Sequence, residues 1–452
     1  MKLTKSLLLA SAAGLAAVAT ASAADLPSKK AAPVEYVKVC PAFGPGFFYI
    51  PGTNTCLRVG GSVTAYMYGT TVWRQANDGF NSAAVFTLYA DARDNTEYGL
   101  LRTYARLGYA RSSGGDENSG SQPRRGQWFS GSGGYANLQT GFSGSQAFIQ
   151  LGGFLAGRTS SFASAGLSAA QFTTQNPSSG NVNQFAYTAS LGNGMSLTAA
   201  VEDAAELREG LYRTTGGAIA AGTQGPNNIP DLAASFDVAQ SWGTVKIAGV
   251  VHNVSPDGRT TTAGDKTGYA LMGATKINLP MIAAGDNIQL FGAYGVGAAG
   301  RVIGNTATDT ANSHATNGGN YSYGVGRTNG GLYDGVYTTE GTLTLTKSYS
   351  YGGQFQHFFS PTVSAYVAGT YGKLDMPGSV QNTTTLRDIA VWGVGLGVIW
   401  SPVAGLEINP EVAYRKATSS FGDVASGNAA AEGSALKNDD SWTMRLRVAR
   451  SF

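Results

Sequence analysis

The stretch SWTMRLRVARSF, from Ser441 to Phe452, alternates between apolar and polar residues. Because successive side chains of a strand point to opposite sides, the two faces of this strand differ. One face carries Trp442, Met444, Leu446 and Val448, and the other carries Arg445, Arg447 and Ala449. This pattern is typical of an outer-membrane β-barrel wall, with lipid on one side and water on the other. A soluble sandwich strand would alternate in the same way, so the rest of the chain must decide.

The amino terminus predicts export from the cytoplasm. Residues 1–23 contain Lys2 and Lys5, an apolar run over 7–19, and the small residues Ala21-Ser22-Ala23. This order is that of a cleavable signal peptide, and the apolar run is too short to span a bilayer. Its removal takes two positive charges from a formal net charge of +3. The nearly neutral remainder argues against a general nucleic-acid-binding surface.

The composition favours a transmembrane barrel over a soluble domain. Charged residues make up 13% of the chain, about half the usual share, and there are 63 glycines in 452 residues. The mean hydropathy is only −0.08. A barrel strand exposes alternate residues to lipid, so low charge without a long apolar segment is what this architecture predicts.

Alternating patterns predict sixteen strands, an even number that suits a single-chain bacterial barrel with a water-filled lumen. The expected strands are 57–69, 85–94, 99–111, 144–152, 154–159, 184–191, 195–203, 231–240, 243–254, 267–279, 287–298, 347–359, 362–374, 388–400, 404–416 and a last strand ending at Phe452. Short turns alternate with long polar stretches at 112–143, 160–183, 204–230, 299–346 and 417–440. Short turns are periplasmic in such barrels, so both termini are expected on the periplasmic side.

The two cysteines, Cys40 and Cys56, both precede the first predicted strand. An exported chain favours a disulfide, and closing a loop of this size contributes about 3 kcal/mol. The alternatives are two unpaired thiols or a metal pair, although no histidine lies nearby to complete a zinc site. We therefore expect three parts: a signal peptide at 1–23, a periplasmic segment at 24–56 with this disulfide, and a barrel domain at 57–452.

The inward-facing sets of the last strand and the first three predict a basic arc on the lumen wall. Its members are Arg58, Arg93, Arg102, Arg106, Arg445 and Arg447, set against Asp91 alone. A basic arc in a narrow aqueous pore raises the local anion concentration, whereas arginines solvated in a wide vestibule would have no selective effect. Glu407 and Glu411 are expected to form a smaller acidic patch on the far side, to which Glu202 and Asp237 could add.

The polar stretch 160–183 is the candidate constriction, because it is long, uncharged and follows the fifth strand. Folded inward, it would narrow the lumen with Phe162 and Phe172 and offer the amides of Gln171 and Gln175. Folded outward, it would leave the lumen open. It supplies no carboxylate to oppose the arginines.

Signals for catalysis are weak. The histidines are His252, His314 and His357, and the chain shows no nucleophile elbow, phosphate-binding loop or zinc-site spacing. We expect a structural or solvated role for each histidine, and neither a cofactor, a metal site nor enzymatic turnover. Were the protein an enzyme after all, replacing His252 should abolish turnover.

The segments VEYVKVC at 34–40, GFFYIPGT at 46–53 and TCLRVGG at 55–61 resemble the amino-terminal signature of alphaproteobacterial general porins. With the signal peptide, the strand count and Phe452, the resemblance covers essentially the whole chain. It implies a homotrimeric, sixteen-stranded porin of the bacterial outer membrane, in contact with lipopolysaccharide. It also implies that the third long loop of the family, here the loop at 160–183, folds into the lumen and that the barrel-assembly machinery recognises Phe452.

These features predict an all-β transmembrane barrel for passive diffusion of small hydrophilic solutes and ions. Because loop 160–183 lacks the usual acidic residues, we expect a weak anion preference or near neutrality. One alternative is a channel specific for a sugar or peptide, with Tyr66, Tyr68 and Tyr104 as a stacking track. Another is a plugged outer-membrane barrel with a structural or adhesive role.

Overall fold

The computed structural model describes residues 38–70, 80–113, 138–165, 180–203, 205, 207–215, 218–222, 225–258, 261–303, 333–338, 341–378, 388–419 and 439–452. The expected signal peptide and Gln171, Phe172 and Gln175 lie outside these residues. In the described part of the chain, no helix has the length and apolar content needed to cross a membrane.

The main sheet closes into an antiparallel barrel, because the first long strand, β2, pairs with the last, β21. All sixteen predicted strands are present: β2 (Cys56–Thr70), β3 (Phe80–Thr96), β4 (Gly99–Ser113), β5 (Leu138–Leu151), β6 (Phe154–Ser160), β7 (Asn181–Gly192), β8 (Met195–Glu202), β11 (Asp231–Gln240), β12 (Gly243–Val254), β13 (Lys266–Asn278), β14 (Asn287–Val296), β17 (Lys347–Ser360), β18 (Val363–Asp375), β19 (Ile389–Trp400), β20 (Leu406–Ser419) and β21 (Asp439–Ser451). A seventeenth strand, β1 (Phe48–Tyr49), only flanks β2. The predicted fold is confirmed.

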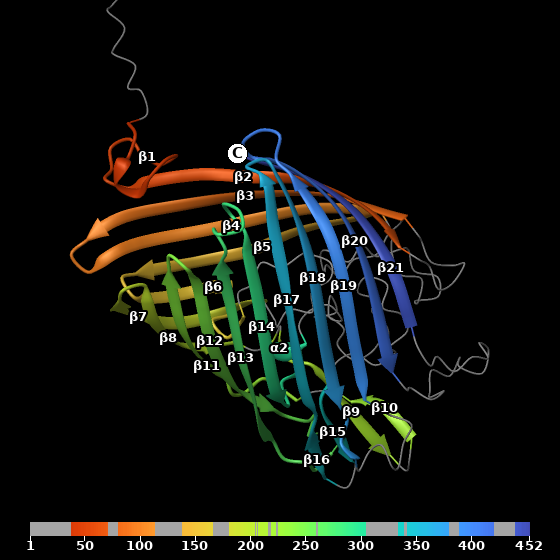
Figure 1. Cartoon of the computed structure of the whole chain (residues 1–452). Coiled ribbons are helices and arrows are strands. Elements are labelled where there is room, and N and C mark those ends of the chain that lie inside the picture. Colours follow the sequence, from red (N-terminus) through yellow and green to blue (C-terminus); the bar gives the residue numbers. More distant parts are fainter. Residues whose placement is uncertain are drawn as a thin grey trace, which may run out of the picture.

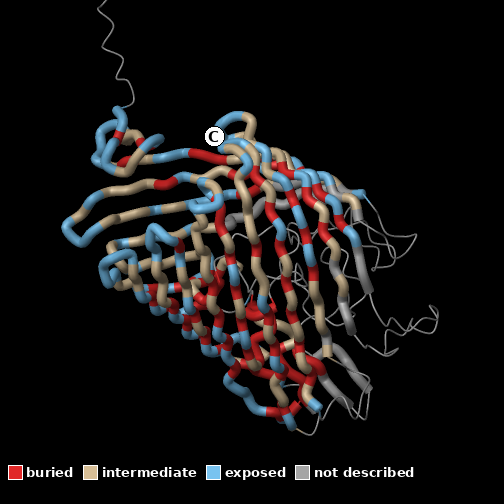
Figure 2. Tube along the Cα trace, viewed as in Figure 1, coloured by how far each residue is buried: buried red, intermediate tan, exposed pale blue. Residues whose placement is uncertain are grey.

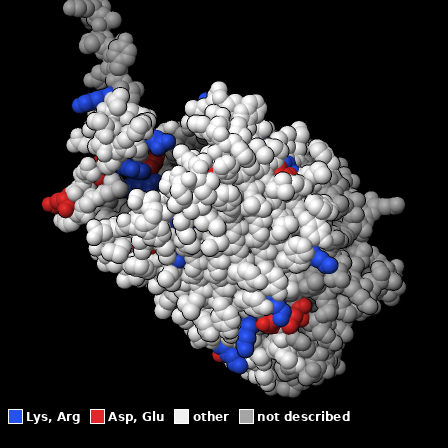
Figure 3. Space-filling model, in the orientation of Figure 1, with Lys and Arg blue, Asp and Glu red and all other residues white. Residues whose placement is uncertain are grey.

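The alternation along each strand is visible as burial. Buried and exposed residues follow one another along β8 and β11 to β14 (Figure 2). In β21, Trp442 and Met444 are exposed while Arg445 is buried, as the sequence predicts. Few charged side chains lie on the visible wall between the two ends of the barrel (Figure 3). Such a wall suits lipid contact.

The two ends of the barrel differ in their connections. At one end, which we call the turn end, the links are short and the carboxy terminus lies near β1 (Figure 1). One of its two-residue hairpins joins β7 to β8 through Asn193 and Gly194, both with positive φ (49° and 70°), as an Asn-Gly turn requires. At the opposite loop end, a small sheet that the sequence did not predict comprises β9 (Gly210–Thr215), β10 (Ala218–Gly222), β15 (Tyr333–Thr338) and β16 (Leu343–Leu345).

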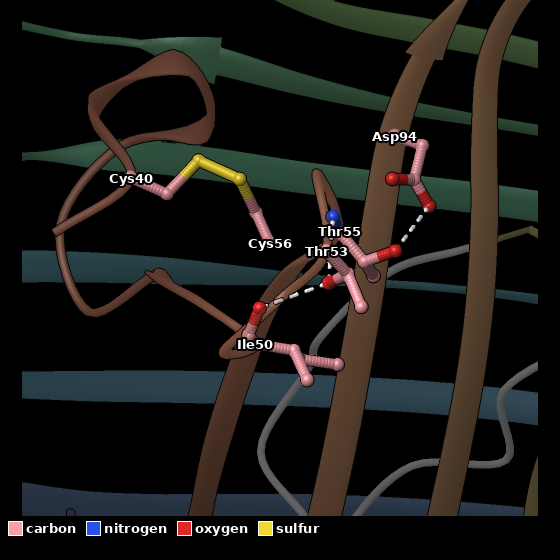
Figure 4. Close-up of a disulfide and its surroundings, with 6 residues drawn as sticks. All are labelled: Cys40, Ile50, Thr53, Thr55, Cys56 and Asp94. Atoms are coloured by element: carbon pink, nitrogen blue, oxygen red, sulfur yellow. Dashed lines mark hydrogen bonds between the residues drawn. A yellow bond between two sulfur atoms is a disulfide. The ribbon is translucent and has the colours of Figure 1, made fainter. Parts of the chain in front are cut away.

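A cap at the turn end precedes the barrel. Cys40 and Cys56 form the predicted disulfide, with their Cα atoms 5.9 Å apart (Figure 4). Both cysteines are buried with Phe47. Thr55, next to Cys56, donates a hydrogen bond to Asp94 of β3 (3.2 Å), which joins the cap to the barrel wall.

Part of the inner wall is covered by chain segments that return into the barrel. The start of the third long loop (161–165) and the short helix α2 (Ala299–Val302) are largely buried. Together with the small sheet they pack on inward residues of β7, β8 and β11 to β14, namely Ala186, Ala200, Ala233, Ala248, Val250, Ala270, Met272 and Ala293. We call β7, β8 and β11 to β14 the covered wall, and β19 to β21 with β2 to β5 the basic wall.

Candidate functional site

The six predicted arginines lie on neighbouring strands. Arg445 and Arg447 lie on β21, Arg58 on β2, Arg93 on β3, and Arg102 and Arg106 on β4. These strands pair in that order around the barrel. Every one of these residues has the inward parity of its strand, opposite to exposed apolar residues such as Val59, Met67 and Leu446. The predicted arc is therefore one continuous surface of the basic wall.

Asp91 holds two of these arginines. It is 4% exposed, and its two oxygens accept hydrogen bonds from Arg93 (2.7 and 3.1 Å) and from Arg102 (2.8 and 3.0 Å). Two guanidinium groups thus bind one carboxylate, and each does so in a bidentate geometry, which is the strongest form of this contact. The Arg93 guanidinium also lies over the ring of Phe47 at 4.8 Å, so the cap rests on this cluster.

Two further carboxylates sit within the arc rather than opposite it. β20 pairs directly with β21, and Glu411 contacts Arg445 at 2.5 Å while Glu407 contacts Arg447. The predicted placement of Glu407 and Glu411 on the far side is wrong, because consecutive antiparallel strands put them beside the arginines. The arc accordingly has six arginines and three carboxylates, which leaves an excess of positive charge.

Aromatic rings form a row across the same wall. Tyr104 of β4 stacks between Tyr89 of β3 (centroids 6.0 Å apart) and Phe148 of β5 (5.3 Å). Tyr66, a suggested partner of Tyr104, is instead buried against Ala83 and Ala413. The side chain of Tyr68 lies outside the described part. The two-residue turn between β3 and β4 sets the register of these strands, and this register brings Tyr89 next to Tyr104. Tyr89 was not among the aromatic residues that the sequence pattern suggested.

Arg301 ties helix α2 to the covered wall. It is 1% exposed, and its guanidinium donates to Glu202 of β8 (2.9 Å), Asp231 of β11 (2.8 Å) and the Ser161 hydroxyl (2.7 Å). Asp231 also contacts Nδ1 of His252 at 2.7 Å. This buried cluster was missed by sequence reasoning. The apolar pairs at 298–299 and 302–303, within a polar stretch, were the available signal.

The same cluster fixes the start of the third long loop. Glu202 accepts hydrogen bonds from the Ser161 hydroxyl (2.8 and 2.9 Å) and from the Phe162 backbone N–H (3.0 Å). Ala163 then packs against the inner wall. Residues 161–165 therefore lie against the inside of the barrel, while the path of the rest of loop 160–183 across the lumen stays a prediction. Glu202, suggested for an acidic patch, instead neutralises Arg301.

The described residues contain no group of three or more His, Cys, Asp or Glu side chains arranged to hold a metal ion. His252 is buried in the Arg301 cluster, and His357 contacts Asp286 at the turn end (2.7 Å). Both histidines therefore have structural partners. His314 lies outside the described part.

A closed sixteen-stranded barrel with a charged inner wall and an apolar outer wall defines the class of outer-membrane channel barrels. The family model of the Porin subfamily matches residues 25–445, and the chain belongs to this family. It accordingly resides in the bacterial outer membrane.

Two porins of Brucella agree with this assignment. Porin Omp2b of Brucella suis is 34% identical over 266 residues, which is 55% of this chain and 65% of that protein. Porin Omp2a of Brucella ovis is 34% identical over 281 residues, 58% of this chain and 74% of that protein. The match thus spans somewhat less than two thirds of the length of Omp2b. Among solved structures, the outer membrane channel DcaP of Acinetobacter baumannii has a similar fold, with a TM-score of 0.57 and 13% identity over 89% of this chain and 99% of that one.

Proposed function

We propose that the protein is a water-filled channel through which small hydrophilic solutes and ions cross the outer membrane by passive diffusion. The observation that carries this proposal is the division of the inner wall. Loop segments pack on small apolar residues of the covered wall, whereas the basic wall presents arginines, hydroxyls and carboxylates. Polar groups that face inward in a barrel are satisfied when water fills the lumen. No turnover and no cofactor are needed for this function.

The assembly that we propose is a homotrimer embedded among lipid and lipopolysaccharide. Family membership supports it, because the relatives are porins. The chain would reach the membrane through the signal peptide at 1–23 and insert after the assembly machinery recognises Phe452. Phe452 is suited to that role, because it is an exposed aromatic residue directly after β21.

The expected ion preference is weakly anionic. Several arginines of the arc have carboxylate partners, namely Arg93 and Arg102 with Asp91, Arg445 with Glu411, and Arg447 with Glu407. Pairing reduces the field that each guanidinium projects into the lumen. Because arginines outnumber carboxylates in the arc, its net charge is positive, and the low-dielectric walls of the pore concentrate the resulting field.

The test is the conductance of the folded protein in a planar bilayer, followed by the zero-current potential across a potassium chloride gradient. We expect large conductance steps in groups of three, one for each channel of the trimer, and a small zero-current potential of the sign that indicates anion selectivity. Replacing Arg102→Ala and Arg106→Ala together should move the potential toward cation selectivity, because two positive charges leave the arc. A strong cation preference of the wild type, or unchanged selectivity of the double variant, would contradict the charge argument. Absence of conductance from folded protein would contradict the channel itself.

A further inference from the structure

A cavity of about 390 Å³ lies on the basic wall near the turn end. Its side-chain lining comes mainly from three adjacent strands, with Arg58, Ser62, Thr87, Tyr89, Tyr104 and Arg106 as the residues that carry its chemistry. Phe452, the carboxy-terminal residue, also lines it. A small organic solute fits into a space of this size, which lies in the usual range of ligand sites.

A glycine makes room for the Tyr89 ring. Gly60 lies opposite Tyr89 across the β2–β3 pair, and a Cβ atom at residue 60 would lie 2.4 Å from the Tyr89 hydroxyl. The missing side chain lets the Tyr89 ring lean over β2. Its hydroxyl group is thereby held close to the backbone of β2, beside the cavity.

Neighbouring rings and guanidinium groups already cover the faces of the rings in the aromatic row. Tyr104 has Tyr89 on one side and Phe148 on the other. The Arg58 guanidinium lies 5.8 Å from the centre of the Tyr89 ring, and the Arg102 guanidinium lies 5.2 Å from that of Phe148. A neutral sugar that needs an open ring face finds none on Tyr104. The site therefore offers hydroxyl and guanidinium groups rather than a stacking platform.

The charges in the cavity favour an anion. Arg58 and Arg106 both line it, on the two strands that flank Tyr89. The opposing negative charge is the terminal carboxylate of Phe452, one oxygen of which accepts a hydrogen bond from the Gly61 backbone N–H (3.0 Å). Among the residues that line the cavity, the two guanidinium groups outnumber this carboxylate, so the lining itself carries an excess of positive charge. Guanidinium groups bind carboxylates with directed hydrogen bonds.

Hydroxyl groups complete the site. Ser62 and Thr87 form a hydrogen bond with each other at 2.9 Å on the cavity wall, and the two tyrosines add phenol hydroxyls to the lining. Each can donate or accept, as the hydroxyl groups of a solute require. We propose that this cavity is a saturable binding site for small hydroxylated carboxylates, such as sugar acids. This proposal rests on the channel function and adds a preferred class of solute to it.

The test uses gluconate as the anionic probe and glucose as the neutral one, with single-channel current recorded at constant ionic strength and pH 7. We expect gluconate to reduce the current along a saturating curve, whereas glucose should reduce it without saturation. Arg58→Gln and Arg106→Gln should each raise the half-blocking concentration of gluconate about tenfold, and Tyr89→Phe a few-fold, since each removes a group that binds the anion. Lys246→Gln is the matched control, because it removes an inward positive charge on β12, opposite Asp237. It should change the half-blocking concentration by less than about twofold, because it lies outside the cavity.

The outcomes separate the two proposals. A conducting channel that gluconate blocks without saturation, or equally in Arg58→Gln, Arg106→Gln and Lys246→Gln, would overturn the binding site while leaving the channel intact. Protein that folds but does not conduct would overturn the channel. If Arg58→Gln fails to assemble, the double variant Arg106→Gln with Tyr89→Phe leaves β2 unchanged and tests the same point. A saturating block that this double variant weakens would support the site, and one that it leaves unchanged would overturn it.

Discussion

The covered wall and the basic wall belong to one sheet, yet their inward residues have opposite characters. On β8 and β11 to β14 the inward positions include Ala200, Ala233, Ala248, Ala270 and Ala293, and returning segments bury them. On β2, β4 and β21 the inward positions include Arg58, Arg106 and Arg447. Small apolar residues on the inside of a barrel thus indicate a second layer of chain, because an apolar surface facing a lumen of water would be unfavourable.

Enclosed and partly exposed ion pairs occur on both walls: Arg445 with Glu411 on the basic wall is enclosed, and Lys246 with Asp237 on the covered wall is partly exposed. Arg301 on the covered wall is enclosed with Glu202 and Asp231, whereas the pair of Arg447 with Glu407 on the basic wall is partly exposed. A buried charge that loses its partner costs far more than an exposed one. We infer that Arg301 uses charge to hold structure, whereas partly exposed arginines of the basic wall such as Arg447 present charge to solutes.

The largest effect is therefore expected for Arg301→Ala. Two buried carboxylates, Glu202 and Asp231, would lose their common cation, at a cost of about 3–5 kcal/mol in the free energy of unfolding. Arg447→Ala is the matched control, and its partly exposed pair contributes less than about 1 kcal/mol. The measurement is the temperature at which each folded barrel converts to the heat-modified form on a gel. Equal losses in the two variants would mean that burial of the ion pair does not set its contribution to stability.

Single-channel recording of Arg301→Ala provides a second test. Loss of the contacts with Ser161 and Glu202 loosens α2, although hydrogen bonds from the Ala299 N–H to Asp334 and from Ser350 to the Val302 carbonyl remain, so we expect more frequent partial closures of the single channel. Arg447→Ala should alter selectivity without such closures. Quiet recordings from a folded Arg301→Ala protein would show that the cluster does not restrain the segment.

A smaller effect is expected from filling the covered wall. Ala200→Phe would force a large ring between β8 and the packed segments, and overpacking of this kind costs about 1–3 kcal/mol. Its neighbour Ala199 faces outward on the same strand and is exposed, so Ala199→Phe is the matched control and should be nearly neutral. Heat conversion again measures both. Similar behaviour of the two variants would indicate that no layer covers Ala200.

The barrel itself could be predicted from the sequence because strand alternation is local. Trp442, Met444 and Arg445 show their faces within one short stretch of β21, and the disulfide of Cys40 with Cys56 follows from an exported chain with two cysteines. The arginine arc followed from closure of the barrel. These inferences need only the direction of each side chain and the order of the strands.

Contacts between distant segments could not be predicted in that way. Arg301 meets Glu202 across 99 positions of the sequence, through a connection that looks like a polar loop. The small sheet joins β9 to β15 from two such loops, in strands of only 6 residues each. The wrong placement of Glu411 has a different reason. Strand order alone makes β20 the neighbour of β21, and this pairing puts Glu411 beside Arg445. Inward alanines were the local signal of the distant segments.

The smallest effect concerns the turn end of the covered wall, where Asp286 closes the turn between β13 and β14. Burial alone would raise the pKa of Asp286, but hydrogen bonds from His357 and the Phe358 backbone N–H, with the charge of His357, hold it below the ordinary value of 3.8. A lowered carboxylate pKa gives stability that is complete above the unfolded-state value and is lost as the pH falls through the folded-state value. We therefore expect Asp286→Asn to lower the conversion temperature at about pH 5, and the gap from the wild type to close as the pH falls below about 4.

The control for this pH series is Asp237→Asn on the same half of the barrel. Asp237 is partly exposed and pairs with Lys246 at 3.5 Å, so its removal should leave only a small gap at every pH. A gap for Asp286→Asn that widens as the pH falls from about 5 to about 3 would contradict the sign of the argument, because protonation of Asp286 would then strengthen the contact instead of removing it. A gap as small as that of Asp237→Asn throughout would mean that the turn end is held by its backbone alone, and that buried charge stabilises the covered wall only around Arg301.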